Sequence, residues 1–214
     1  MFEARSGLSP IGARPSTPRR VRLSGRHAIQ IVERLKLLTI PGYTGSGPQH
    51  WQSVWERADP SMTRVPQEDW DHPDPEAWSA RIDAAVRAAG QPLLLIAHSC
   101  GVTAVAHWTS RFNTKIAGAF LVAPPDTDRD DLDEPVKKFA LPRLMPLPFR
   151  AVVVASENDP YCTFDRARQL AGAWRASLVS AGNAGHINTA SGHGPWPEGR
   201  RLLEDFCVAL GQNR

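Results

Sequence analysis

Apolar residues in this chain gather into short continuous runs, separated by longer segments of mixed pattern. A run of four to eight apolar residues between turn signals is typical of a strand buried on both faces. Runs of this kind predict strands at 35–40, 93–98, 116–122 and 149–155, and shorter segments at 62–65 and 178–179 predict two more. Because such strands alternate with helical patterns, the sequence predicts a mostly parallel sheet with helices on both faces.

Helical patterns fill most of the intervals between these strands. Asp74, as an N-cap, followed by Pro75 and an acidic first turn, predicts a helix that ends at Gly90. Further helices are predicted after the 93–98 strand, from Phe164 to Trp174, and from Glu198 onward. The stretch between Val122 and Phe149 shows no clear element, and its length predicts a functional loop over the site. It is too short to form a cap domain.

The most informative turn follows the 93–98 strand. There the chain reads Ala97-His98-Ser99-Cys100-Gly101, and a helical pattern begins at once. Small residues two before and two after a serine allow the tight strand–turn–helix corner of the nucleophile elbow. The hydroxyl of Ser99 would then stand at the carboxyl end of the sheet, and the N–H of Cys100 could donate to an oxyanion. The alternative is an ordinary strand end with a small-residue turn.

A serine at such an elbow needs an acid and a base, in the chain order Ser, Asp, His. Asp159 follows the 149–155 strand, and Pro160 would stiffen its turn. Glu157 and Asp165 lie nearby and remain rivals for the acid. A turn aspartate before proline is also common without any catalytic role.

The candidate base is His186, which lies in a glycine-flanked loop after the last predicted strand. Neutral imidazole is available near neutral pH to take the serine proton and return it to a leaving group. His193 has the right chain position too and remains the alternative. The glycine-rich loop after the first strand could supply the second oxyanion donor, with the N–H of Tyr43 as candidate. A phosphate loop is the competing interpretation, but the Walker and Rossmann spacings are missing.

Composition places these motifs in one soluble, globular domain. The chain has 214 residues, 42% of them hydrophobic, and no apolar stretch long enough to span a membrane. Its net charge of +3 is uneven, because residues 1–36 carry eight basic side chains and two acidic ones, which leaves the rest at −3. An acidic body with a basic leader does not indicate a nucleic-acid-binding protein. We expect residues 1–33 to lie outside the fold, as a disordered or mis-assigned extension, and 34–214 to form the domain.

The three cysteines, Cys100, Cys162 and Cys207, are widely separated in apolar or catalytic-looking contexts. They predict free thiols in a reducing compartment, and hence a cytoplasmic protein. The segment 69–74 contains Asp and His residues in a metal-like cluster, but its prolines and the cap at Asp74 favour a structured turn. The sequence therefore predicts neither a metal nor a cofactor.

Taken together, these motifs resemble those of the small serine hydrolases related to retinoblastoma-binding protein 9. The resemblance covers roughly residues 35–211. It is carried by Pro41-Gly42, by 46–52 (SGPQHWQ), by 97–101 (AHSCG), by 156–161 (SENDPY), and by 185–188 (GHIN) with 191–197 (SGHGPWP). It implies a compact α/β-hydrolase fold without a large cap, and a Ser–Asp–His triad at Ser99, Asp159 and His186. Ester cleavage and aminopeptidase-like activity are what the resemblance suggests, on a small-molecule ester or amide and without a cofactor.

Several residues around these motifs have a less certain purpose. Cys100 stands where the family often has Leu, which alters the pocket but leaves the backbone role. His98 is expected to pack under the loop rather than act as a base. His50 and Trp51 are expected mainly to anchor the oxyanion loop, and with Tyr161 they are candidate pocket residues.

Two other functions stay open from the sequence. The chain could be a protein-binding scaffold that keeps the hydrolase fold with little turnover, although binding alone does not need a full triad. Cys100 could instead be a thiol nucleophile at its helix N-terminus. Its direction along the helix, off the apex of the elbow, counts against that hypothesis.

Overall fold

The computed structural model describes residues 35–90, 92–141 and 143–211, so the expectation for residues 1–33 lies outside the described residues. The six strands are β1 (Lys36–Ile40), β2 (Met62–Arg64), β3 (Leu93–His98), β4 (Gly118–Val122), β5 (Arg150–Ala155) and β6 (Ser177–Ser180). The helices are α2 (Trp51–Ala58), α3 (Pro75–Ala89), α4 (Cys100–Arg111), α5 (Glu134–Lys137), α6 (Phe164–Trp174) and α7 (Pro197–Gly211), with a 3₁₀ turn at Thr189–Ser191.

All the strand pairs are parallel, in the order β2-β1-β3-β4-β5-β6. The strand β3 lies inside the sheet between β1 and β4, and its Ala97 is in register with Ile40 and Leu121. The carboxyl ends of neighbouring parallel strands meet at one edge of a sheet. The loops that follow β1, β3 and β5 are therefore brought together at that edge.

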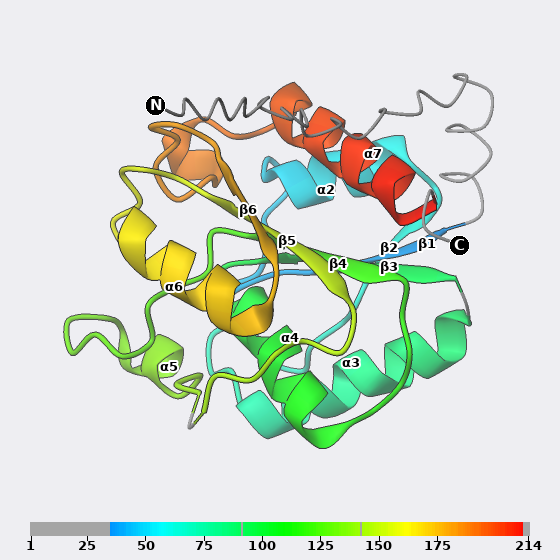
Figure 1. Ribbon diagram of the computed structural model, residues 1–214, viewed down its shortest axis with the longest axis horizontal. Coiled ribbons are helices and arrows are strands. Elements are labelled where there is room, and N and C mark those ends of the chain that lie inside the picture. Colours follow the sequence, from blue (N-terminus) through cyan, green and yellow to red (C-terminus); the bar gives the residue numbers. More distant parts are fainter. Residues whose placement is uncertain (1–34, 91, 142, 212–214) are drawn as a thin grey trace, which may run out of the picture.

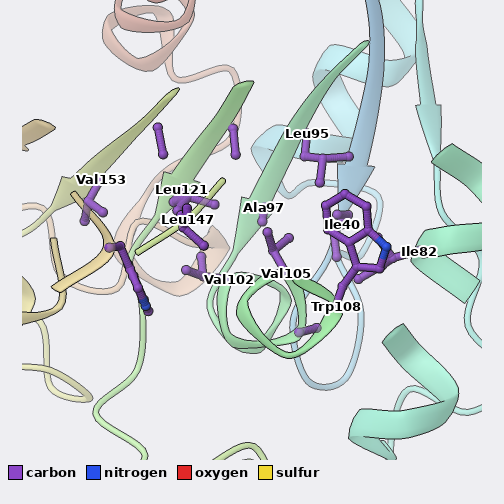
Figure 2. Close-up of a cluster of buried hydrophobic side chains, with 14 of the residues drawn as sticks. Ile40, Ile82, Leu95, Ala97, Val102, Val105, Trp108, Leu121, Leu147 and Val153 are labelled. Atoms are coloured by element: carbon purple, nitrogen blue, oxygen red, sulfur yellow. The ribbon is translucent and has the colours of Figure 1, made fainter. Parts of the chain in front are cut away.

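Helices cover both faces of the sheet, as the alternating pattern predicts (Figure 1). On one face, α3, α4 and α6 pack against the strands through Ile82, Val105 and Leu170, among others. Figure 2 shows part of this core, where Trp108 of α4 lies with Ile40 of β1 and Leu95 of β3. On the other face, α2 and α7 bury a second cluster. Ser99 stands at the end of a strand that both cores hold in place.

The segment 123–149, in which the sequence showed no clear element, carries a short helix and a buried anchor. It contains the short helix α5, and its Phe139 is fully buried against Trp78. The backbone carbonyl of Phe139 also lies 3.2 Å from a ring nitrogen of His107 on α4. The segment is thus held against the helices of one face because its apolar side chains have a core to fill. None of its described residues is in the wall of the cleft at Ser99, although the N–H of Asp126 donates to the carbonyl of Tyr161 at 2.9 Å, in the turn that follows Asp159.

The N-cap of α3 and the lengths of the helices both bear on predictions from the sequence. The side chain of Asp74 accepts a hydrogen bond from the backbone N–H of Ala77, which confirms it as the N-cap of α3. Among the described residues, no helix is both long and apolar enough to cross a bilayer.

Candidate active site

Ser99 occupies a backbone conformation that few residues other than glycine adopt. Its φ is 54° and its ψ is −126°, at the junction between β3 and α4. Its N–H donates to the carbonyl of Val122 at 3.0 Å, and its own carbonyl accepts from the N–H of Val102 at 2.8 Å. Positive φ at a serine between strand and helix is the geometry of a nucleophile elbow.

The elbow brings three predicted residues together. His186 Nε2 lies 2.9 Å from Ser99 Oγ, and His186 Nδ1 lies 2.9 Å and 3.0 Å from the two carboxylate oxygens of Asp159. The side chain of Asp159 is only 2% exposed and that of His186 is 9% exposed. Because a carboxylate only accepts, Nδ1 carries the proton and Nε2 is left to accept from the serine hydroxyl.

The loop after β1 lies directly against the elbow. A Cβ on Gly42 would stand 2.8 Å from the Cβ of Ser99, and one on Gly101 would stand 2.2 Å from the carbonyl oxygen of Ile40. Only glycine fits at either place. A Cβ on Gly42 would also stand 3.1 Å from the N of Cys100, the first residue of α4, and the backbone N–H of the next residue, Tyr43, is the candidate second donor.

A cleft of about 410 Å³ opens at Ser99. Its walls are the glycine-rich loop after β1, the rings of His50 and His98, His186, and the segment 188–190. Thr44, Asn188 and Thr189 are polar, and among the described residues no Asp, Glu, Lys or Arg side chain lines the cleft.

The chain is similar to a known protein family over most of its length. A family model described as serine hydrolase matches residues 37–205, most of the chain. The chain belongs to the serine hydrolase family. A YdeN-like hydrolase from Pectobacterium atrosepticum is 36% identical, with a TM-score of 0.75 over 85% of this chain and 95% of the other. No curated protein matches the chain.

More distant solved structures share the fold of this serine hydrolase. The YdeN protein of Bacillus subtilis is 18% identical, with a TM-score of 0.66 over 84% of this chain and all of the other. Est1E from Butyrivibrio proteoclasticus, in a structure with ferulic acid bound, is 14% identical, with a TM-score of 0.66 over 84% of this chain and 90% of the other. The fold is a compact α/β-hydrolase fold, and the described chain shows no large cap.

The rivals for the acid and the base lie elsewhere in this serine hydrolase. Glu157 accepts from the hydroxyl of Ser180 at 2.7 Å, and Asp165 pairs with Arg168 at the surface. The Nδ1 of His193 lies 3.1 Å from Ser191 Oγ. Of these candidates, the structure brings only Asp159 into contact with His186.

The three candidate pocket residues, His50, Trp51 and Tyr161, lie at different positions relative to the cleft. Trp51 is fully buried and donates from Nε1 to the carbonyl of Ile187 at 3.0 Å, so it anchors the histidine loop and lines no cleft, contrary to the pocket expectation. Tyr161 is 43% exposed and is not part of the cleft wall either, but its ring centroid lies 4.5 Å from that of His186. His50 lines the cleft and also caps α2, accepting from the N–H of Gln52.

Burial controls the ionisation of several groups around Ser99. It raises the pKa of the Cys100 thiol to about 12, which opposes a thiolate nucleophile. It lowers the pKa of His50 to about 3, with the charge of Arg64 as a smaller cause. Burial also lowers the pKa of His98 well below its ordinary value. His50 and His98 are therefore neutral at neutral pH.

Some residues that hold the site were quoted in motifs but given no role by sequence reasoning. Asn158 Oδ1 accepts from the N–H of Gly185 at 2.7 Å, which joins the aspartate loop to the histidine loop. Gln52 is fully buried, and its amide donates to the carbonyl of Ile96 and accepts from the hydroxyl of Ser46. The sequence shows a polar residue, Gln52, beside the apolar Trp51. It could not show the partner of Gln52, because Ile96 lies 44 positions away.

Proposed function

We propose that this serine hydrolase cleaves a small ester or amide by acyl transfer, with Ser99 as nucleophile, His186 as base and acid, and Asp159 as the residue that orients His186. The observation that carries the proposal is the pair of contacts at His186, to Ser99 Oγ on one side and to the buried Asp159 carboxylate on the other. The resemblance to the retinoblastoma-binding protein 9-like group supports the same assignment.

The proton transfers use the contacts among Ser99, His186 and Asp159. Ser99 Oγ attacks the carbonyl carbon of the substrate while His186 Nε2 takes its proton. The N–H groups of Cys100 and Tyr43 stabilise the oxyanion of the tetrahedral intermediate. The imidazolium, paired with Asp159, then gives its proton to the leaving alcohol or amine, and an acyl-enzyme remains. Water, deprotonated by His186, hydrolyses the acyl-enzyme and restores Ser99.

The steady-state rates of p-nitrophenyl esters of graded chain length, beside aminoacyl p-nitroanilides, test this proposal. We expect the short esters to be turned over and Ser99→Ala to lower kcat by a factor on the order of a million. Ser110→Ala is the matched control, because Ser110 is exposed on the same helix α4 and hydrogen-bonds only within it. Full activity in Ser99→Ala, or no turnover of any ester or amide by the wild type, would contradict the proposal; the latter result would favour the scaffold.

A further inference from the structure

The turn after β1 contains a residue in an unfavourable backbone conformation. Thr44 has a φ of 63°, and it is followed by Gly45 with a φ of 72°. Positive φ costs free energy at a β-branched residue, because its Cβ crowds the backbone. One internal hydrogen bond closes the turn, from the N–H of Gly45 to the carbonyl of Gly42 at 3.0 Å. The side chain of Thr44 is exposed, so its own contacts contribute little to holding the turn.

A second segment, residues 69–72, contacts this turn. The backbone carbonyl of Trp70 accepts a hydrogen bond from the N–H of Thr44 at 2.9 Å. The indole ring of Trp70 lies against Gly45, where an added Cβ would stand 3.3 Å from Cδ2 and 3.4 Å from Cγ of the ring. Trp70 therefore holds two consecutive residues of the turn, one through its backbone and one through its ring.

Trp70 is itself held in place from behind. Its ring packs edge to face with that of Trp78 on α3, at a centroid distance of 5.4 Å, and Trp78 is only 2% exposed. The backbone around Trp70 is ordered by the carboxylate of Asp69, which accepts from the N–H groups of Asp71 and His72 at 2.8 Å each. The residues that look like a metal cluster in the sequence thus order the turn that carries Trp70.

Trp70 lies behind the cleft and not in its wall. The described wall of the cleft at Ser99 includes Tyr43, Thr44 and Gly45 but not Trp70. The N–H of Tyr43, the proposed oxyanion donor, belongs to the turn that Trp70 holds. Such a donor is effective at roughly 2.7–3.1 Å from the oxyanion, so a small displacement of the turn weakens it.

We propose that Trp70 is a positioning residue of this hydrolase, which holds Thr44 and Gly45 in their strained turn and so keeps the N–H of Tyr43 in place for the oxyanion. The inference rests on the proposed function, in which that N–H stabilises the tetrahedral intermediate. Because the oxyanion forms only after the substrate has bound, loss of this support should lower kcat with little change in KM.

Two substitutions at position 70 keep or remove the flat ring. Trp70→Phe keeps an aromatic face for Gly45, whereas Trp70→Leu keeps only apolar bulk against Trp78. With p-nitrophenyl acetate, we expect Trp70→Leu to lower kcat about tenfold to a hundredfold, and Trp70→Phe to stay within about threefold of the wild type. Phe149→Ala is the control for a general loss of packing, because Phe149 is a half-buried ring of the same core that precedes β5, at the other edge of the sheet. It should lower stability and leave kcat unchanged.

Glycine at position 44 tests whether Trp70 acts by opposing strain in the turn. Glycine adopts positive φ without steric cost, so the turn should keep its shape with less support. The factor by which Trp70→Leu lowers kcat should therefore be at least about threefold smaller in the Thr44→Gly background than in the wild type. Comparison within each background removes any direct effect of Thr44→Gly on the cleft.

The results that overturn the inference are distinct from those that overturn the proposed function. A kcat in Trp70→Leu equal to that of the wild type, a loss confined to KM, or an equal loss of kcat in both backgrounds would overturn the inference, while Ser99→Ala still abolishes turnover. If Trp70→Leu does not fold, Trp70→Met, whose flexible side chain fills the same space, takes its place with the same expected results. If the wild type hydrolyses no ester or amide, the proposed function fails, and the inference fails with it.

Discussion

His98 donates a hydrogen bond from Nε2 to the backbone carbonyl of His186, at 2.9 Å. The residue before the proposed nucleophile therefore holds the residue proposed as the base. His98 ends β3 and is 5% exposed, and a carbonyl can only accept, so the proton of this ring is committed to the contact. The buried pair ties the histidine loop to the centre of the sheet.

Removal of this contact should misplace the imidazole. We expect His98→Ala to lower kcat about tenfold to a hundredfold with a smaller change in KM, because displacement of a catalytic group by about 1 Å has effects of that size. His98→Gln should recover part of the loss, since its amide nitrogen reaches the position of Nε2. Steady-state kinetics on a folded variant decide the point, and an unchanged kcat in His98→Ala would assign His98 to packing alone.

A methyl group on Gly42 should harm activity more than stability. A Cβ there would stand 2.8 Å from Ser99 Cβ and 3.1 Å from the Cys100 nitrogen, so the loop that carries Tyr43 must move away from the elbow. We expect Gly42→Ala to lower kcat/KM about a hundredfold, the scale of one lost oxyanion donor. Gly172→Ala on α6 is the control, because a Cβ there meets nothing within 4 Å. Wild-type rates in Gly42→Ala would show that this loop takes no part in the chemistry.

The two carboxylates after β5 should differ sharply in effect. Asp159→Asn should lower kcat by about 10³- to 10⁴-fold, because an amide does not stabilise the imidazolium and favours the wrong tautomer. Glu157→Gln should change kcat less than about threefold, since Glu157 contacts Ser180 and not His186. The same ester assay ranks both variants. The reverse order would move the acid to Glu157.

The buried histidines should make the fold sensitive to acid. The folded-state pKa values of His50 and His98 lie below the ordinary value of 6.5, so below that pH the unfolded chain binds protons that the folded chain does not. The free energy of unfolding should therefore fall as the pH drops from 6.5, by up to about 1.4 kcal/mol per pH unit for each histidine, until the folded pKa of about 3 for His50.

Urea unfolding at pH 7.5, 5.5 and 4.5 measures this dependence. His50→Asn keeps the cap but cannot titrate, so its stability should decline less steeply between pH 6 and 4 than that of the wild type. Above pH 6.5 both states are neutral at this position, and the two proteins should show the same dependence on pH. Equal slopes below pH 6 would mean that His50 does not stay neutral in the folded chain.

Local signals in the sequence were sufficient for the strands and for most of the helices. The runs at 93–98 and 149–155 matched β3 and β5 closely, because fully buried strands need continuous apolar residues. The helix α2 was not predicted. It has eight residues and a histidine as its N-cap, which is not a usual cap residue. The indole N–H groups of its Trp51 and Trp55 donate to backbone carbonyls more than 130 positions away.

The sequence predicted which residues form the candidate site but not how the residues around it pack. Chain order and small-residue turns pointed to Ser99, Asp159 and His186, because these features are local. The packing of the 123–149 segment was not predicted, since the burial of Phe139 depends on a partner, Trp78, in a distant helix. The contact of Trp70 with Gly45 depends likewise on where two segments meet in the fold, which no local pattern records.

The identity of the residue that a fluorophosphonate modifies tests the central claim most directly. The wild-type protein, incubated with the probe at neutral pH and digested, should give a single adduct on Ser99, located by tandem mass spectrometry of the peptide that also contains Cys100. Ser99→Ala should show no adduct, while Cys100→Ala should be labelled as the wild type is. An adduct on another residue, or labelling that survives in Ser99→Ala, would contradict the account.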